Sequence, residues 1–278
     1  MLNKKIISYA QNFEDVMLWR AFKNIKNGIY IDVGANDPLH DNTTKIFYDN
    51  NWSGINIEPI DEHFKELEKD RVRDINLNCL VGEKKREEVE FFVSNIRGLS
   101  TTKIKKSNSL FHKNIKYKKV YRKMLSLNDI LISTQFKEIH FLKIDTEGSE
   151  EEVLKGLDLS IYRPWIIIVE SNDFQDIAGE SDRCELLLKD ASYSFVYYDG
   201  LNKFYLANEQ DKYKKYFYAP PNIHDNFDKY LELKNIENVE IHNKNHEIKL
   251  LNEGTKTLSR KVIGLSNTIS ELQNQIDK

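Results

Sequence analysis

The sequence predicts an α/β protein: a mixed, mostly parallel β-sheet with helices on both faces, followed by a C-terminal coiled-coil helix. Three observations support this fold class. Short runs of β-branched and aromatic residues alternate with amphipathic stretches, which is typical of βαβ units and a parallel sheet. An Asp-Gly turn then separates two more strand-like runs, as in a β-hairpin. Near the end of the chain, aliphatic residues recur with heptad spacing.

The expected parallel part of the sheet consists of strand-like runs at 29–33, 55–57, 75–81, 139–144 and 165–169. Between the first two runs, Asp41 is expected to cap a helix that extends to about Asn50, and Gly54 restarts the chain as a strand. Between the last two runs, Ser149 is expected to cap a short helix that ends at Gly156. Both connections fit right-handed crossovers.

A helix and a hairpin follow the fifth run. The helix is expected over 181–191, and the segments 195–198 and 204–207 flank the turn Asp199-Gly200-Leu201-Asn202. Together with the parallel strands, the hairpin predicts a seven-stranded mixed sheet. Class I methyltransferases and other doubly wound folds share this inventory, so it predicts the fold and not the function.

The stretch 88–124 does not follow this alternation. It contains a strand-like run at 89–93, a loop at 98–102 and a Lys-rich portion at 103–123. We interpret it as an insertion above the carboxyl edge of the sheet, where loops often carry function. His112 and the lysines around it would suit an anionic acceptor, although a lysine-rich loop is more often simply solvated.

The globular domain is expected to span 1–219 and to end before Pro220-Pro221, with a linker or helical extension at 220–247. The segment 248–278 fits a coiled coil. β-Branched residues at position a with leucines at position d favour a parallel two-stranded coil, so a homodimer or other oligomer is expected. The a positions hold Ile248, Thr255, Val262, Ile269 and Ile276, and the d positions hold Leu251, Leu258, Leu265 and Leu272.

The composition excludes several classes of protein. The 41 lysines and arginines against 44 acidic residues give a formal net charge of -3, which disfavours a binder of duplex nucleic acid. Cys79 and Cys184 lie far apart, so neither a disulfide framework nor a cysteine-rich zinc site is expected. The sequence shows no secretory signal and no apolar run long enough for a transmembrane segment, so a cytoplasmic location is expected.

The segment from Tyr30 to Asp37 predicts a buried strand that runs into a turn with a single glycine. Gly34, which precedes Ala35, lets a ligand approach the backbone closely. Asp32, Asn36 and Asp37 offer acceptors to an ammonium group or to hydroxyl groups. A dinucleotide site would instead want several glycines leading into a helix N-terminus, without acidic side chains. The turn therefore suits S-adenosylmethionine, which has no phosphate, better than NAD.

Two further strand ends complete the expected cofactor site. Glu58 ends the second run, where an acidic residue can bind both hydroxyls of a ribose, and Pro59 fixes the chain directly after it. Leu80 and Val81, at the end of the third run, would contact an adenine ring.

A second cluster lies at the ends of the fourth and fifth runs. Asp145 follows the fourth run, beside the switch point where ligands bind in such sheets. Methyl transfer to a hydroxyl requires that the acceptor be aligned and its proton removed, for which Asp145 is the first candidate and Glu147 the second. Alternatively, Asp145 would hold Mg²⁺ together with Glu170 and Asn172 from the end of the fifth run.

Five segments between residues 5 and 172 form an ordered set. They are Ser8-Tyr9-Ala10-Gln11-Asn12-Phe13-Glu14-Asp15, Ile31-Asp32-Val33-Gly34-Ala35-Asn36, Gly54-Ile55-Asn56-Ile57-Glu58-Pro59, Gly98-Leu99-Ser100-Thr101 and Leu142-Lys143-Ile144-Asp145-Thr146-Glu147-Gly148-Ser149-Glu150. As a set they resemble the FkbM family of methyltransferases. The resemblance implies a class I, Rossmann-like methyltransferase fold and an O-methyltransferase that depends on S-adenosylmethionine. Members of the family commonly modify sugar or polyketide hydroxyls.

The resemblance also implies roles by position. Asp32, Gly34 and Asn36 would line the methionine end of the cofactor. Glu58 would contact the ribose, and Asp145 would lie near the transferred methyl group.

The segment 9–15 would cover the site from the N-terminal side, with Gln11 and Glu14 as its polar contacts. Asp37-Pro38 departs from the family, in which glycine often follows the asparagine, so the role of Asp37 stays open.

The expected function is therefore O-methylation of a sugar, glycan or glycan precursor in polysaccharide biosynthesis. The coiled coil would dimerise the enzyme or tether it to a glycan-assembly protein, which would place it peripherally at the inner membrane. Two alternatives stay open: an NAD-dependent nucleotide-sugar oxidoreductase or epimerase, and a non-catalytic coiled-coil scaffold with a methyltransferase-like head.

Overall fold

The computed structural model describes residues 5–103, 115–171 and 180–238, and then short pieces at 240–241, 244, 248–249, 251 and 255–256. The chain divides into two compact units, Met1–Phe227 and Asp228–Lys278.

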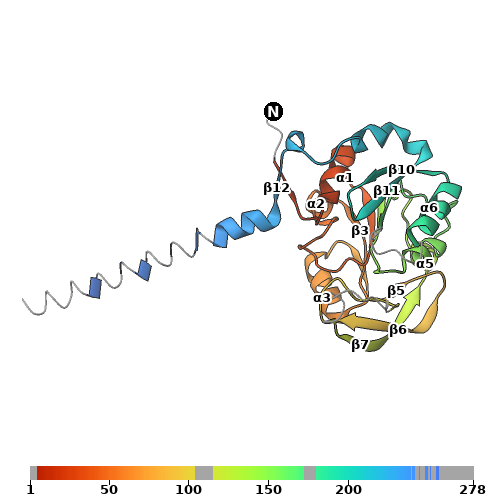
Figure 1. Ribbon diagram of the computed structural model, residues 1–278, viewed down its shortest axis with the longest axis horizontal. Coiled ribbons are helices and arrows are strands. Elements are labelled where there is room, and N and C mark those ends of the chain that lie inside the picture. The colour runs from red at the N-terminus through yellow and green to blue at the C-terminus, as the bar shows by residue number, and fades with distance from the viewer. Residues whose placement is uncertain are drawn as a thin grey trace, which may run out of the picture. The chain divides into compact units, whose positions relative to one another are not determined.

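One seven-stranded sheet forms the centre of the first unit (Figure 1). Its strands, in spatial order, are β10 (Tyr193–Tyr198), β11 (Asn202–Ala207), β9 (Ile166–Glu170), β8 (Phe141–Ile144), β2 (Ile29–Val33), β3 (Ser53–Ile57) and β4 (Ile75–Leu77). Neighbouring strands are parallel from β9 to β4, whereas β11 runs antiparallel to both β9 and β10. The predicted mixed seven-stranded sheet is confirmed.

Helices cover both faces of this sheet. Successive strand residues point to opposite faces, so Tyr30 and Phe141 join one buried cluster while Ile31 and Leu142 join the other. The first cluster packs against α1 (Glu14–Phe22), α2 (Lys45–Asp49) and the 3-10 segment η2 (Asn208–Phe217). The second packs against α4 (Leu127–Leu131), α5 (Glu150–Lys155) and α6 (Glu180–Asp190). Figure 1 shows α1 and α2 on one side of the strands and α5 and α6 on the other.

The predicted insertion is a separate three-stranded sheet of β5 (Leu80–Val81), β7 (Tyr117–Leu125) and β6 (Arg86–Ser94), in that spatial order. It lies beside α3 (Asp61–Asp70) in Figure 1. The expected strand at 75–81 was therefore wrong as a single element, because β4 ends at Leu77 and β5 pairs with β7 instead. The prediction of a loop for the lysine-rich portion was wrong from Tyr117 onward, because the chain there forms a strand that pairs with β6. The remainder, including His112, lies outside the described residues.

Local capping differs from the expectation at two helices. Asp41 does not cap α2; the Asn42 side-chain oxygen accepts hydrogen bonds from the N–H groups of Thr44 and Lys45. Ser149 occupies the N-cap position of α5 without a capping bond, because its hydroxyl pairs with that of Thr102 at 2.6 Å.

The hairpin turn is confirmed. Asp199 accepts hydrogen bonds from the N–H groups of Leu201 and Asn202, at 2.7 and 2.6 Å. Gly200 takes a φ of 98°, which glycine adopts without steric cost.

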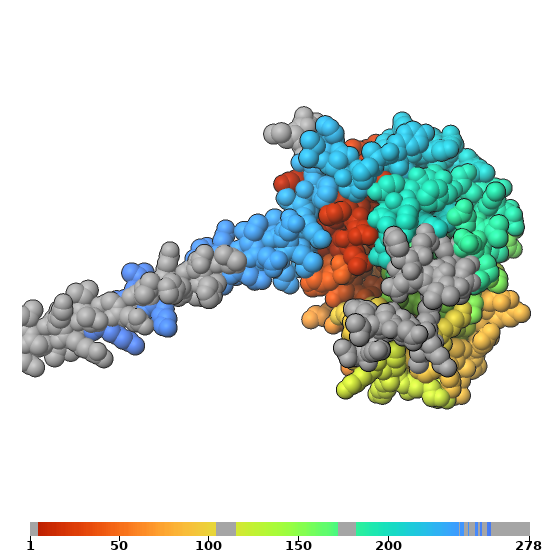
Figure 2. Space-filling view, in the orientation of Figure 1, coloured from red at the N-terminus to blue at the C-terminus, as the bar shows by residue number. Residues whose placement is uncertain are grey.

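The first unit extends past the expected boundary at 219. After η2, the chain forms η3 (Ile223–Asp225), and Arg20 of α1 binds Asp225 through two hydrogen bonds of 2.6 and 2.7 Å. The N–H of Ile6, in β1 (Ile6–Ser8), donates to the Asn226 carbonyl. Figure 2 accordingly shows the N-terminal segment, in red, beside the segment after β11, in cyan to blue.

The second unit continues from β12 (Phe227–Lys229) into a helix that begins at Tyr230. Of the predicted heptad positions, Ile248, Leu251 and Thr255 are described, and the side chains of Ile248 and Leu251 are 54% and 70% exposed. The sequence from 257 onward lies outside the described residues, so most of the predicted coiled coil is not tested. In the described parts of the chain, no helix is both long enough and apolar enough to cross a membrane.

Candidate functional site

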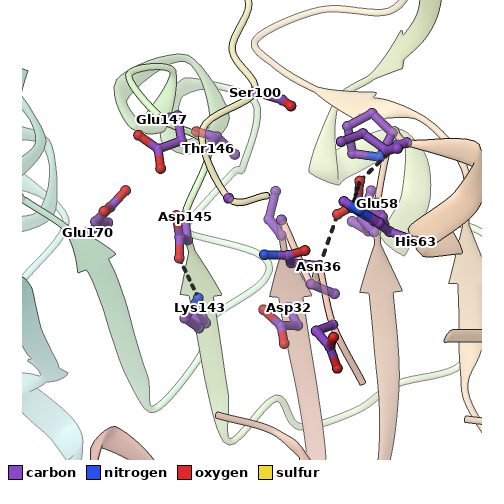
Figure 3. Close-up of a pocket in the computed structure, with 18 of the residues that line it drawn as sticks. Asp32, Asn36, Glu58, His63, Ser100, Lys143, Asp145, Thr146, Glu147 and Glu170 are labelled. Carbon is purple, nitrogen blue, oxygen red and sulfur yellow. Dashed lines mark hydrogen bonds and ion pairs between the residues drawn. The ribbon is translucent and has the colours of Figure 1, made fainter. Parts of the chain in front are cut away.

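A cavity of about 470 Å³ lies at the carboxyl ends of β2, β3 and β8 (Figure 3). Parallel strands gather their carboxyl ends at one edge, which is where open α/β sheets bind ligands. The insertion supplies the upper wall through the loop after β6. The sequence-predicted residues that line the cavity are Gln11, Asp32, Gly34, Ala35, Asn36, Asp37, Glu58, Pro59, Leu80, Val81, Asp145, Glu147 and Glu170.

Two predicted site residues are not among these lining residues. Glu14 is a buried residue at the start of α1, and its carboxylate accepts hydrogen bonds from the Asn202 amide at 2.7 Å and from the N–H of Asn12 at 2.9 Å. Burial raises the pKa of Glu14 to about 7. Asn172, the expected third metal ligand, lies outside the described residues.

The backbone requires a glycine at position 34, independently of any ligand. Its φ is 84°, and a Cβ atom at this position would lie 1.9 Å from the carbonyl oxygen of Asp145. The N–H of Asp145 donates to the carbonyl of Val33, so the turns after β2 and β8 are locked together. The glycine therefore allows the close approach of Asp145, in addition to the ligand approach that the sequence suggested.

Asp32 lines the cavity, and one of its carboxylate oxygens is buried without a hydrogen-bond partner among the described residues. The residue is 1% exposed, and its Oδ2 accepts a hydrogen bond from the Thr44 hydroxyl at 3.3 Å. Its Oδ1 has no hydrogen-bond partner in the described structure. A buried oxygen without a donor is costly, so it fits a ligand that brings one. The most suitable donor is a cationic group such as an ammonium.

Glu58 follows β3 and is held by the backbone on both oxygens. Its Oε2 accepts a hydrogen bond from the N–H of Asn36 at 3.0 Å, and its Oε1 accepts one from the N–H of Ile60 at 2.8 Å. Asn36 has a φ of 51°, which turns its N–H toward the carboxylate. Burial raises the pKa of Glu58 to about 7, although these hydrogen bonds oppose the shift. The remaining lone pairs of the carboxylate are available to ligand hydroxyls.

A partly buried ion pair lies at the end of β8. The ammonium of Lys143 is 2.8 Å from Oδ2 of Asp145 (Figure 3). Burial disfavours the charge of Lys143, but the carboxylates of Asp145 and Asp32 outweigh it and raise the pKa of the ammonium. Burial also works against ionisation of Asp145, yet Lys143 and a hydrogen bond from Glu170 hold its pKa below the usual range.

The pKa of Glu170, at the end of β9, is shifted in the opposite direction. Burial, and then the negative charges of Asp145 and Glu147, raise the pKa of Glu170 well above its ordinary value. Glu170 donates a hydrogen bond to the carboxylate of Asp145. Neighbouring carboxyl groups whose pKa values are shifted in opposite directions are a common arrangement for acid–base chemistry.

Glu147 is placed by a strained turn. Its φ is 55°, which is unusual for a residue other than glycine, and the next residue is Gly148 at 103°. The Glu150 carboxylate stabilises this turn by accepting hydrogen bonds from the N–H groups of Thr146 and Gly148, at 2.9 and 3.1 Å. The turn brings the Glu147 side chain toward Asp145 and Glu170 (Figure 3).

The three acidic residues of this region form a candidate metal site. Asp145, Glu147 and Glu170 each place one oxygen within 4.8 Å of the others. However, Lys143 already pairs with Asp145 at 2.8 Å. Part of the negative charge that a divalent cation requires is therefore already balanced.

Sequence reasoning assigned no role to two residues that shape the site. Lys143 was visible as a charged residue inside an apolar strand, a signal that indicates a buried partner. Arg97 lines the cavity and reaches Asn36 and Asp37 from the insertion. Nothing in its local sequence distinguishes it from the other basic residues of that stretch.

Comparison with known proteins gives one family and several distant structures. The model of the methyltransferase FkbM domain matches residues 32–195. Similar solved structures include methyltransferase FkbM from Methylobacillus flagellatus, at 15% identity and a TM-score of 0.39, covering 65% of this chain and 43% of that one. The match thus spans less than half of that relative. None of the curated proteins matches the chain.

Two other solved structures are similar at the same low level. A TehB-like SAM-dependent methyltransferase from Corynebacterium glutamicum shares 7% identity with a TM-score of 0.36, covering 70% of this chain and 87% of that one. The precorrin-6y C5,15-methyltransferase from Geobacter metallireducens shares 13% identity with a TM-score of 0.35, covering 70% and 75%.

Proposed function

This chain belongs to the FkbM methyltransferase family, and on that premise we propose that it transfers a methyl group from S-adenosylmethionine to a hydroxyl of a sugar, glycan or glycan precursor. The observation that carries the proposal is the carboxylate of Asp32, a residue that lines the cavity and whose buried Oδ1 has no hydrogen-bond partner among the described residues. The ammonium of the cofactor's methionine end would satisfy it. Glu58 would bind the ribose hydroxyls, and Leu80 and Val81 would contact the adenine.

The charge of the cavity wall supports this cofactor over NAD. The carboxylic acids among the described lining residues are Asp32, Asp37, Asp41, Glu58, Asp145, Glu147 and Glu170. The lysine and arginine found among the same residues, Lys143 and Arg97, are both paired with acids. A pyrophosphate would therefore meet negative charge without a free cation, whereas a sulfonium and an ammonium would be attracted.

The reacting end of the site is formed by Asp145 and its neighbours. When bound, S-adenosylmethionine supplies a methyl group on a positively charged sulfur. The ionised carboxylate of Asp145 would align the acceptor hydroxyl and accept its proton as the new carbon–oxygen bond forms. Lys143 holds this carboxylate in place and keeps it charged, and Glu170 donates a hydrogen bond to it.

The affinity for S-adenosylhomocysteine, the reaction product, is expected to rise with pH. The carboxylate of Glu58 is the form that accepts two ribose hydroxyls, and its pKa is about 7 in the free protein. Binding should therefore strengthen by up to about tenfold per pH unit below 7 and level off above it. Calorimetric titrations from about pH 5.5 to 8.5 test this, with Glu58→Gln as the control in which the dependence should flatten. Identical profiles for the two proteins would contradict the assignment of Glu58.

Methyl transfer itself is tested with methyl-labelled S-adenosylmethionine and a panel of sugar acceptors. Label should reach a hydroxyl oxygen of one acceptor class. The same assay with and without EDTA separates proton acceptance by Asp145 from metal binding by Asp145. Because Lys143 already balances the charge of Asp145, we expect that EDTA does not inhibit the reaction. Loss of transfer that Mg²⁺ restores would instead support metal binding.

We also propose that the C-terminal helix forms a parallel coiled coil with a second copy of the chain. Its support is the heptad pattern and the exposure of Ile248 and Leu251, which a soluble helix leaves uncovered only at some cost. Analytical ultracentrifugation should give a dimer that Leu258→Asp and Leu265→Asp together convert to a monomer. The other role proposed for this helix is to bind a glycan-assembly protein. A monomeric wild type would favour that role.

A further inference from the structure

The loop after β6 crosses the upper side of the cavity. Its base is fixed on β6, because Phe92 and Thr101 exchange backbone hydrogen bonds of 2.9 and 3.1 Å. Between these two residues, the chain runs out to Arg97 and Gly98, and the loop residues from Arg97 to Ser100 line the cavity. Figure 3 shows Ser100 above the cavity, between Glu147 on one side and Glu58 on the other.

The tip of this loop is attached to the turn after β2. The guanidinium of Arg97 donates from Nε to Oδ1 of Asn36 at 2.7 Å, and its Nη1 lies 3.2 Å from Oδ2 of Asp37. Its Nη2 donates to Glu66 of α3 at 2.7 Å. One side chain therefore joins the insertion to the proposed cofactor turn and to the helix beside it.

The base of the loop is attached to the opposite side of the cavity. The hydroxyl of Thr101 donates to the carbonyl of Glu147 at 2.8 Å, and the hydroxyl of Thr102 shares a hydrogen bond with Ser149 at 2.6 Å. The loop thus spans from the cofactor turn to the turn that carries Glu147.

Arg97 also affects Glu58 indirectly, because both residues bind Asn36. Asn36 is in the left-handed region, which is strained for a residue with a side chain, and its N–H orients the Glu58 carboxylate. A guanidinium bound to the Asn36 side chain restricts that conformation. Gly98 also lies next to this amide, with an added Cβ only 3.7 Å from the Asn36 nitrogen.

We propose that Arg97 is a positioning residue: it fastens the loop 95–103 over the bound cofactor and, through Asn36, holds Glu58 in its binding orientation. The inference rests on the proposed function for the identity of the ligand. The guanidinium stays 36% exposed, so water competes for its hydrogen bonds and the attachment is reversible. Release of Arg97 would then free the loop for entry and departure of the cofactor.

The test is the kinetics of S-adenosylhomocysteine binding, measured by surface plasmon resonance on the full chain. Because a fastened loop slows both entry and release, Arg97→Ala should raise both rate constants. Loss of the Glu58 orientation should weaken the affinity by about tenfold, the effect of losing one charge-assisted contact. Arg97→Lys should behave like alanine, because an ammonium cannot bind Asn36, Asp37 and Glu66 in the same fork.

The matched control is Lys119→Ala, which removes an exposed ion pair to Glu90 from the same insertion and should change neither rate constant. Thermal unfolding of all three variants should match the wild type, which separates positioning from a loss of fold. A rise in the dissociation rate alone would mean that Arg97 contacts the ligand directly, and it would overturn the inference, as would unchanged rates.

A second readout does not need the ligand. In the free protein, Arg97→Ala should increase hydrogen exchange at the amides of Leu99 and Asn36, while amides of the central strand β2 keep their protection. Unchanged exchange would overturn the fastening role whatever the protein binds. If the wild type fails to bind S-adenosylhomocysteine, the proposed function fails, and the exchange experiment still decides whether Arg97 fastens the loop.

Discussion

Asp145→Asn is expected to lower the rate of methyl transfer by about 10²- to 10⁴-fold, the usual contribution of a positioned acid or base. Asparagine keeps the size of the side chain and an oxygen for the ammonium of Lys143, but it cannot take a proton from the acceptor. S-adenosylhomocysteine should still bind, because Asp32 and Glu58 are unchanged. The measurement is the single-turnover rate with saturating S-adenosylmethionine and the acceptor found in the transfer assay.

Glu147→Gln is the matched comparison for this prediction. Glu147 shares the same region of the cavity but lies on a turn that also holds the loop through its carbonyl, which the substitution leaves intact. If Asp145 accepts the proton, Glu147→Gln should have the smaller effect. The reverse order would transfer the role to Glu147, and an unchanged rate in both variants would show that neither carboxylate accepts the proton.

Gly34→Ala is expected to destabilise the protein by about 2–4 kcal/mol and to abolish cofactor binding. The added methyl group would collide with the carbonyl of Asp145, which lies 1.9 Å from the Cβ position, and the φ of 84° is itself unfavourable for alanine. Relief of the collision must separate the turns after β2 and β8, which carry Asp32 and Asp145. Urea denaturation gives the change in the free energy of unfolding.

Gly200→Ala separates the two causes. Gly200 has a similar φ of 98°, but a Cβ atom there would meet no atom within 4 Å. It should therefore cost only the conformational penalty, about 1 kcal/mol, and leave binding intact. Equal losses of stability in the two variants would contradict a steric role for the contact between Gly34 and Asp145.

Much of the fold could be predicted because the relevant signals are local. The strands β2, β8 and β9 are mostly apolar runs that end at polar turns, which is the pattern of strands buried on both faces, and only Asp32 and Lys143 interrupt the first two. The turn Asp199-Gly200 specifies its hairpin through two adjacent residues. By contrast, β7 mixes lysine and arginine with aromatic and aliphatic residues. Because of these charges the sequence did not predict a strand there, although pairing with β6 stabilises one.

In the candidate site, too, some residues could be located from the sequence and others could not. Residues at the ends of predicted strands, such as Asp32, Glu58 and Asp145, line the cavity because the parallel sheet brings strand ends to one edge. Arg97 reaches the same cavity from a separate sheet, so its place depends on how the insertion folds over the edge. Glu14 was expected at the cavity but binds Asn202 instead, a contact between residues 188 positions apart in the sequence.

Binding of S-adenosylmethionine in this cavity is tested most directly by a calorimetric titration of the purified chain with S-adenosylhomocysteine, alongside NAD⁺ and with Glu58→Ala as the control. We expect the wild type to bind S-adenosylhomocysteine and NAD⁺ not to bind. The variant should lose about 2–3 kcal/mol of binding free energy, as expected when a charged hydrogen-bond acceptor is removed. Binding of NAD⁺ in preference would support the oxidoreductase or epimerase alternative. Binding of neither ligand would contradict the account and favour a non-catalytic scaffold.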